Sequence, residues 1–169
     1  MGIIRLYEIC PEAEKAGTQN AVVTGVTDNT AEVKHGSIFV CVKGARFDGH
    51  SAAAEMLSKG AVMIVTDHDI KCGKQLVTDN TRLCLARLLN SFYGKPSEKL
   101  GLLAVTGTNG KTTTAHFVKH ILTTLGKKCG CIGTAGNDTC SGELKPSQHG
   151  TPTVPRATVL YSWLGEMVS

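Results

Sequence analysis

The run Gly-Thr-Asn-Gly-Lys-Thr at 107–112 constrains the fold of this chain more than any other feature. It lies between the apolar stretch 102–105 and a segment whose apolar residues recur at helical spacing from Val118 to Leu125. A strand, a tight turn and a helix in this order direct successive backbone N–H groups toward one point, and the helix dipole adds positive potential there. The sequence therefore predicts a phosphate-binding loop within an α/β fold.

Each residue type in this loop suits contact with a nucleotide. The two glycines allow a close backbone approach, the lysine ammonium would lie on the β and γ phosphates, and the following hydroxyl is a ligand for Mg²⁺. We therefore predict a nucleotide and Mg²⁺ as ligands, with Lys111 and Thr112 as catalytic residues and Thr112 as the metal ligand. The predicted nucleotide-binding residues are Gly107, Thr108, Asn109, Gly110, Lys111, Thr112 and Thr113.

An alternative interpretation is an ordinary strand-to-helix turn that contains Gly-Lys-Thr by chance. The standard pattern has a further glycine where this chain has Val105, so the loop is a shorter variant. The apolar stretch before it and the amphipathic segment after it favour nucleotide binding.

A linker-like segment at 93–99, with Gly94 and Pro96, predicts a domain boundary that divides the chain into 1–97 and 98–169. With 169 residues, two domains fit only if both are small or one is incomplete. The first part predicts a small α/β domain with some parallel strand pairing. Its expected elements are strands at 37–42 and 61–65, a helix at 51–59 ended by Gly60, and a helix through Leu85–Phe92 with Asp79 or Asn80 as its N-cap.

The second part predicts the truncated start of a parallel-sheet P-loop domain. Leu102–Val105 is expected as a strand, and the helix after the loop should end at Gly126 with an apolar face of Val118, Ile121, Leu122 and Leu125. Further expectations are a strand at 129–133, a long polar loop at 134–150, and a helix that opens at Val154 or Pro155 and ends near Val168.

Composition excludes several classes of partner. The net charge of +4 is scattered and only 5% of residues are aromatic, so neither a basic patch nor a stacking platform for nucleic acid is expected. The seven cysteines are odd in number and lie mostly in apolar stretches, which is typical of a reducing compartment. Without a signal peptide or membrane span in the pattern, we expect a cytoplasmic protein with no membrane partner.

Three separated segments resemble the Mur ligases, the enzymes that build the peptide stem of peptidoglycan. The run at 105–114 is similar to their ATP loop. The segment 36–61, with its Gly…Asp-Gly-His loop followed by a helix and Gly-Ala, resembles the UDP-substrate domain of the MurE type. The run Gly-Cys-Ile-Gly-Thr at 130–134 is similar to the strand after the P-loop helix in MurE. MurF is the neighbouring alternative, and Thr108-Asn109 favours MurE.

The resemblance implies an ATP-dependent ligase that adds a diamino acid, diaminopimelate or lysine, to UDP-N-acetylmuramoyl-L-alanyl-D-glutamate through an acyl phosphate. These two small molecules are the expected partners. The implied substrate contacts include Asn29, where the family has serine, and Thr151, which keeps one hydroxyl of the family's Thr-Thr-Pro. Ala45 and Arg46 in the Asp-Gly-His loop and His149 beside Gly150 complete the predicted substrate-binding set. Neither the choice of diamino acid nor the oligomeric state follows from the sequence.

Three histidines have both a catalytic and an ordinary interpretation. For Asp48 and His50 we favour a turn that leads into a helix over a catalytic pair. His116 and His120 have the spacing of a shared metal site, but without a third ligand in the pattern a solvated helix face is favoured. The Cys-Gly-Cys at 129–131 has the wrong spacing for a zinc knuckle and indicates a buried strand.

The 57 residues after Thr112 have room for one strand and one helix, whereas a complete P-loop domain needs several strands and a later acidic residue. We therefore expect an N-terminal fragment without ligase activity of its own. The alternatives from other classes are a short P-loop nucleotide-binding module and a basic nucleic-acid binder, of which the second is disfavoured by the scattered charge.

Overall fold

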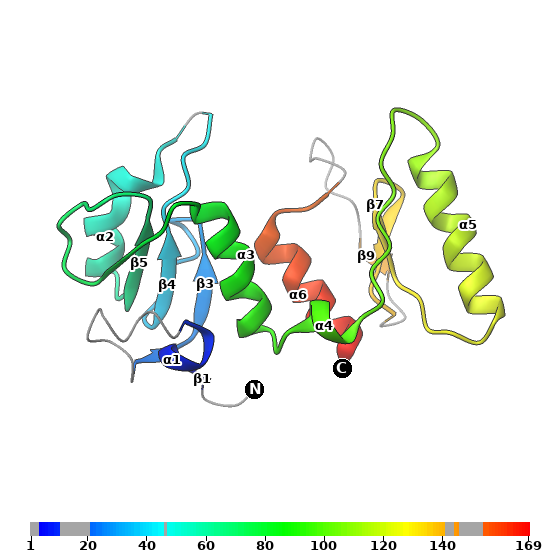
Figure 1. Cartoon of the computed structure of the whole chain (residues 1–169), viewed down its shortest axis with the longest axis horizontal. Helices are drawn as coiled ribbons and strands as arrows, with labels where there is room; N and C mark the ends of the chain where they lie inside the picture. The colour runs from blue at the N-terminus through cyan, green and yellow to red at the C-terminus, as the bar shows by residue number, and fades with distance from the viewer. Residues whose placement is uncertain (1–3, 11–20, 46, 141–143, 146–153) are drawn as a thin grey trace. The chain divides into compact units, whose positions relative to one another are not determined.

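The computed structural model describes residues 4–10, 21–45, 47–140, 144–145 and 154–169. It divides into two compact units, Met1–Phe92 and Tyr93–Ser169 (Figure 1). Arg46, His149 and Thr151, three of the predicted substrate-binding residues, lie outside the described residues.

The first unit is built on a four-stranded sheet in which every pairing is parallel. The strands are β3 (Gly25–Thr27), β4 (Ser37–Val40), β5 (Met63–Thr66) and β6 (Gln75–Val77), in that order across the sheet. The register pairs Val26 with Ile38, Phe39 with Ile64, and Val65 with Leu76. All residues of β4 and β5 are buried, because a parallel sheet covered on both faces requires apolar residues at successive positions.

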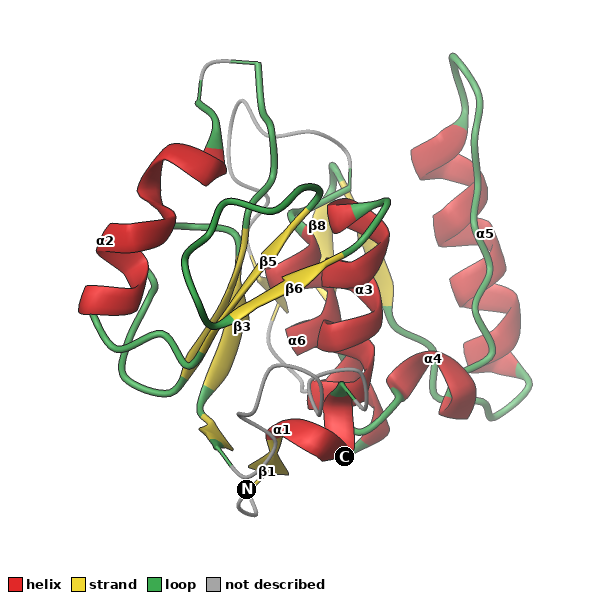
Figure 2. Cartoon of the chain, turned by 60° about the vertical axis from the view of Figure 1, so that its left-hand side comes forward, coloured by secondary structure: helices red, strands yellow, loops and turns green. Residues whose placement is uncertain are grey.

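Helices cover the two faces of this sheet, as Figures 1 and 2 show for α2 (Ala53–Ser58) and α3 (Thr81–Phe92). Met56 of α2 packs in one core cluster with Phe39 and Ile64. Helix α3 contacts β3, β4 and β5 and buries the predicted residues Leu85, Leu88, Leu89 and Phe92. The α/β class and the parallel sheet predicted from the sequence are therefore confirmed.

The predicted ends of these helices are confirmed at two residues. The Asn80 side chain accepts a hydrogen bond from the Leu83 N–H at 2.9 Å, so Asn80 rather than Asp79 caps α3. Gly60 follows α2 with φ of +99°, and a Cβ there would lie 3.0 Å from the His35 Cα. Only glycine meets both conditions without strain.

Four strands of the first unit were not predicted from the sequence: β3, β6 and the pair β1 (Ile4–Arg5) and β2 (Val22–Val23), which form a short antiparallel ribbon. A short helix, α1 (Leu6–Ile9), follows β1, contacts α3 and buries Leu6 completely. A 3₁₀ turn, η2 (Gly49–Ala52), leads into α2.

The second unit contains α4 (Pro96–Lys99), α5 (Lys111–Thr124), α6 (Ala157–Val168) and an antiparallel sheet of β7 (Cys131–Gly133), β8 (Gly136–Asp138) and β9 (Leu144–Lys145). Helix α5 contacts β7, and α4 contacts α6. Gly126 follows α5 with φ of +76°, which confirms the predicted end of that helix.

Helix α5 has the predicted apolar face, although no residue of α5 is buried. Two expectations for this unit were wrong. Residues 102–105 are not a strand: a strand exists only through pairing, and no described strand pairs with them. The segment expected as a polar loop contains β8 and β9. Asn137 of β8 is buried where a strand usually has an apolar residue, so the sequence pattern did not indicate a strand. Its side-chain oxygen accepts a hydrogen bond from the Gly133 N–H at 3.1 Å.

Among the described residues, no helix combines the length and the apolar character needed to cross a bilayer.

Candidate active site

The predicted phosphate-binding loop runs from an extended segment into the N-terminus of α5. Gly107 has φ of +150° and Gly110 has φ of +76°, so both adopt backbone conformations that favour glycine. The first hydrogen bond of the helix runs from the Thr114 N–H to the Gly110 carbonyl oxygen at 2.9 Å. The N–H groups of residues 111–113 therefore precede the helical ladder and point toward the loop, where an anion can accept from them.

The side chains at the start of α5 close this loop. The Lys111 ammonium donates to the carbonyl oxygens of Gly107 at 2.7 Å and Thr108 at 3.3 Å. The Thr112 hydroxyl lies 3.0 Å from the hydroxyl of Thr134, which follows β7. The loop thus brings one cation and two hydroxyl oxygens beside free backbone donors, which is a set that can bind a phosphate and an oxygen-preferring cation.

In the first unit, the predicted substrate contacts lie beyond the C-terminal ends of the parallel strands. Asn29 follows β3, and its side-chain oxygen accepts from the Ala31 N–H at 3.2 Å while its amide donates to Glu32 at 2.9 Å. Glu32 also accepts from the Thr27 hydroxyl at 2.7 Å. Both polar groups of Asn29 are therefore used within its own turn, and Glu32 is a member of this turn that the sequence did not reveal.

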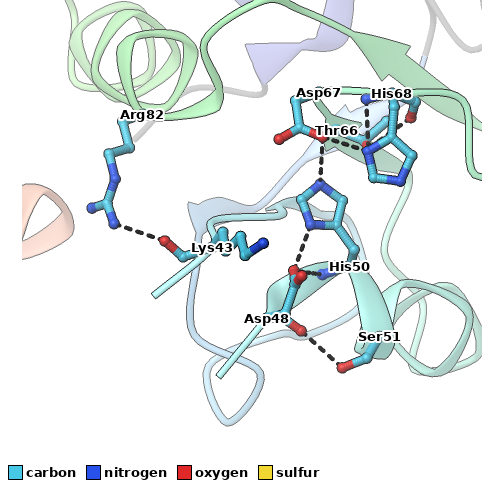
Figure 3. A network of polar contacts seen from close by, with 8 residues as sticks. All are labelled: Lys43, Asp48, His50, Ser51, Thr66, Asp67, His68 and Arg82. Carbon is cyan, nitrogen blue, oxygen red and sulfur yellow. Dashed lines mark hydrogen bonds and ion pairs between the residues drawn. The ribbon is translucent and has the colours of Figure 1, made fainter. Parts of the chain in front are cut away.

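The loop after β4 carries Ala45, which is exposed. Lys43 and Asp48 form an antiparallel bridge, and the Gly44 N–H donates to the Phe47 carbonyl at 2.9 Å, so the loop folds back on itself. Arg82 of α3 donates to the Lys43 carbonyl at 3.0 Å and holds the base of the loop (Figure 3). The predicted contact residue Ala45 thus lies exposed in a turn that these hydrogen bonds hold in place.

Asp48 and His50 form the predicted turn. The Asp48 side chain caps η2 by accepting from the His50 backbone N–H at 3.1 Å, and it lies 2.6 Å from the His50 Nδ1. The His50 side-chain hydrogen bond, followed by the backbone one, lowers the pKa of Asp48. The turn interpretation is therefore confirmed by the capping geometry.

Two further residues reach the same place from the end of β5. Asp67 lies 3.2 Å from the His50 Nε2 and 2.5 Å from the His68 Nδ1, as Figure 3 shows. The hydrogen bond from His68 is the main cause that lowers the pKa of Asp67. Asp67 and His68 were not predicted from the sequence, because only the parallel register of β4 and β5 brings them to His50.

His116 and His120 are both exposed on α5, in agreement with the solvated-face interpretation. The described cysteines are free thiols. Burial raises the pKa of Cys41 to about 12, so this thiol stays protonated and behaves as a small apolar group in the core.

Two family models match the chain and together cover nearly all of it. Residues 22–104 match the model described as "Mur ligase family, catalytic domain", and residues 105–169 match the "Mur ligase middle domain".

Curated relatives carry names of the same kind. A UDP-N-acetylmuramoyl-L-alanyl-D-glutamate–2,6-diaminopimelate ligase 2 of Clostridium acetobutylicum is 36% identical over 90% of this chain and 32% of its own length. The corresponding ligase of Aquifex aeolicus is 42% identical over 66% of this chain and 23% of its own length. A UDP-N-acetylmuramyl-tripeptide synthetase of Deinococcus radiodurans is 36% identical over 94% of this chain and 33% of its own length. The chain thus spans about a quarter to a third of the length of these relatives.

Solved structures show the same fold. A diaminopimelate ligase structure matches 99% of this chain and 34% of its own chain with a TM-score of 0.73 at 23% identity. A MurF structure from Acinetobacter baumannii matches 74% of this chain and 29% of its own with a TM-score of 0.53 at 25% identity.

Proposed function

The chain belongs to the Mur ligase family, and we propose that it carries the UDP-substrate-binding and nucleotide-binding parts of an ATP-dependent ligase of peptidoglycan biosynthesis. In this proposal residues 1–97 bind the UDP end of UDP-N-acetylmuramoyl-L-alanyl-D-glutamate, and residues 98–169 begin the ATP-binding domain. The ligase adds a diamino acid to the D-glutamate carboxylate in the cytoplasm. The names of the relatives support this choice of reaction.

The observation that carries the proposal is the set of groups at the start of α5. The N–H groups of residues 111–113 precede the first helical hydrogen bond and would bind phosphate oxygens. Lys111 now donates to the Gly107 carbonyl and would exchange that partner for the β and γ phosphates. Thr112 would hold Mg²⁺ through its hydroxyl, since hydroxyl and phosphate oxygens are the ligands that this ion prefers.

The proposed chemistry needs no side-chain nucleophile. The γ-phosphoryl group moves to the D-glutamate carboxylate, which gives an acyl phosphate and ADP, and the amine of the diamino acid then displaces inorganic phosphate. Lys111 would stabilise the charge on the transferred group, while the loop N–H groups hold the nucleotide in line. Bound Mg²⁺ would supply further neutralisation of the phosphate charge.

At the substrate end, we propose that Asn29, Ala45 and Arg46 line the UDP site, together with His149 and Thr151. The described members follow β3 and β4, at the edge where the carboxyl ends of parallel strands meet and where open α/β sheets bind ligands. Asn29 would release one of its two turn hydrogen bonds to contact the uridine.

The test is MgATP binding by the 169-residue chain, measured by calorimetry for the wild type and for Lys111→Ala. Removing a charged hydrogen bond to phosphate costs about 1.5–3 kcal/mol, so the variant should bind about 10- to 100-fold more weakly. Lys127→Ala, at an exposed lysine beyond the end of α5, is the matched control and should bind like the wild type. Equal affinity for all three proteins would contradict the assignment of Lys111.

The MurF reaction is the second candidate, supported by the likeness to the Acinetobacter baumannii MurF structure. A MurE-type protein should prefer the UDP-muramyl dipeptide and a MurF-type protein the UDP-muramyl tripeptide. Because the relatives are several times longer, we also propose that the 169 residues alone do not form the amide bond. Tripeptide formation by this chain would refute that part of the proposal.

A further inference from the structure

A cluster of two imidazoles and a carboxylate lies at the C-terminal edge of the parallel sheet of the first unit. His50 comes from η2, and Asp67 and His68 directly follow β5. One ligand atom from each of the three residues lies within 4.8 Å of the others. The two imidazole rings are stacked, with centroids 4.8 Å apart.

Asp48 fixes the orientation and the tautomer of His50. Its Oδ1 lies 2.6 Å from the His50 Nδ1 and also accepts from the His50 backbone N–H at 3.1 Å. An ionised carboxylate can only accept, so Nδ1 carries a proton, and in the neutral ring the lone pair is then on Nε2. A carboxylate that accepts from one ring nitrogen while the other stays free is the usual support of a metal-binding histidine.

The free nitrogen is buried and faces another acceptor. The His50 side chain is only 10% exposed, and no group in the described part of the chain makes a hydrogen bond to Nε2. The atom lies 3.2 Å from the Asp67 Oδ1, but without hydrogen-bond geometry. A lone pair held against a carboxylate oxygen is unfavourable in the neutral state of the ring, and a cation between the two atoms would relieve it.

The spacing of these atoms fits a first-row metal. Tetrahedral ligands at about 2.0–2.1 Å from zinc lie about 3.3 Å from one another, close to the 3.2 Å between Nε2 and Oδ1. The His68 Nδ1 is nearer to the same oxygen, at 2.5 Å, and its side chain is 62% exposed. A small rotation of this exposed ring would bring Nδ1 to ligand spacing, with its proton on Nε2 instead.

We propose that His50, Asp67 and His68 bind one divalent transition-metal ion of the class that prefers imidazole, with Asp48 as the positioning residue. Two nitrogens and one carboxylate suit Zn²⁺ rather than Mg²⁺, which prefers oxygen ligands throughout. Three protein ligands leave a fourth position for water or for an anionic oxygen. The bound ion would join the loop after β4 to the end of β5, and the inference does not depend on the proposed ligase function.

The experiment is a Zn²⁺ titration of the 169-residue chain by calorimetry in a His116→Ala/His120→Ala background. This background removes the exposed histidine pair of α5, which has the spacing to bind zinc by itself. We expect one Zn²⁺ per chain, and more than tenfold weaker binding after either Asp67→Asn or His68→Ala. Asp48→Asn should weaken binding about 10- to 100-fold, the usual effect of losing such a carboxylate.

Both ligand variants alter residues that are at least 45% exposed, so the fold should survive, and far-ultraviolet circular dichroism checks this. Co²⁺ in place of Zn²⁺ tests the donor set, because thiolate ligands give an intense near-ultraviolet charge-transfer band and the proposed site should lack it. Unchanged affinity in Asp67→Asn and His68→Ala, or a thiolate band with Co²⁺, would overturn the proposal.

Discussion

The ion pair of Lys119 and Asp138 joins α5 to β8 within the second unit. The Lys119 ammonium donates to the Asp138 carboxylate, and each side chain is 25% exposed. The hydrogen bond from Lys119 lowers the pKa of Asp138, and the same hydrogen bond raises the pKa of Lys119. The pair therefore links the helix of the phosphate loop to the sheet through groups that depend on pH.

The sign of this dependence follows from the two shifts. The stabilisation from Asp138 is present above its unfolded pKa of about 3.9 and is lost as the pH falls through the lower folded value. The stabilisation from Lys119 is present below its unfolded pKa of about 10.4 and is lost as the pH rises through the higher folded value. The pair thus contributes between about pH 5 and pH 10.

We predict that Asp138→Asn lowers the free energy of unfolding by about 1 kcal/mol at pH 7, the scale of a partly exposed charged hydrogen bond. The difference from the wild type should be smaller near pH 3 than at pH 7, because the stabilisation from the ionised Asp138 is lost as the pH falls from the unfolded pKa through the lower folded value. Urea unfolding at the two pH values measures it. A difference of the same size at pH 3 and pH 7 would mean that packing, rather than charge, is lost.

Among the elements, α2 ends at a position that requires glycine. Gly60 combines a left-handed φ of +99° with the His35 Cα at 3.0 Å from the position of an added Cβ. Gly73 has a similar φ of +83°, but nothing lies within 4 Å of its Cβ position. A substitution at Gly73 therefore tests backbone strain alone, whereas the same substitution at Gly60 tests strain together with crowding.

We predict that Gly60→Ala destabilises the first unit by about 1–3 kcal/mol. Gly73→Ala, the matched control, carries only the left-handed penalty of about 1 kcal/mol. Urea unfolding of both variants gives the comparison. If Gly73→Ala cost as much as Gly60→Ala, the contact with His35 would have no measurable effect.

Helix α3 could be predicted from the sequence, whereas strand β6 could not. Leu85, Leu88, Leu89 and Phe92 predicted α3 because helical periodicity is a local property, and all four are buried. The strand β6 was missed because Gln75–Val77 is short and half exposed, without an apolar run. The meeting of His50 with Asp67 and His68 was also missed, because it depends on strand register and not on any local pattern.

At the scale of the whole chain, apolar side chains of the second unit remain exposed in two segments. Leu103 is 74% exposed before the phosphate loop, and Phe117 is 64% exposed on α5. In these two segments the exposed apolar residues are Leu102, Leu103, Val105, Phe117, Ile121 and Leu125. Exposed apolar groups in this number are typical of surfaces that bind other protein segments or self-associate.

We predict that the 169-residue chain binds an apolar dye such as ANS at neutral pH, and that Phe117→Gln reduces the signal without loss of stability. Phe47→Gln is the control, since Phe47 is 53% exposed but lies apart from this set in the first unit. Dye fluorescence and urea unfolding measure the two effects. An equal reduction in both variants would show that the α5 surface is not the main binding site.

The parallel sheet of the first unit has a consequence for the order of events during synthesis. Parallel neighbours cannot be joined by a tight hairpin, so each of the three pairings requires an intervening crossover segment to be complete first. Helix α3, which covers one face of this sheet, is synthesised later still, because it ends at Phe92. A ribosome must therefore release most of the first unit before β4 and β5 can be shielded from water, and folding of this unit should follow translation of α3 rather than proceed strand by strand.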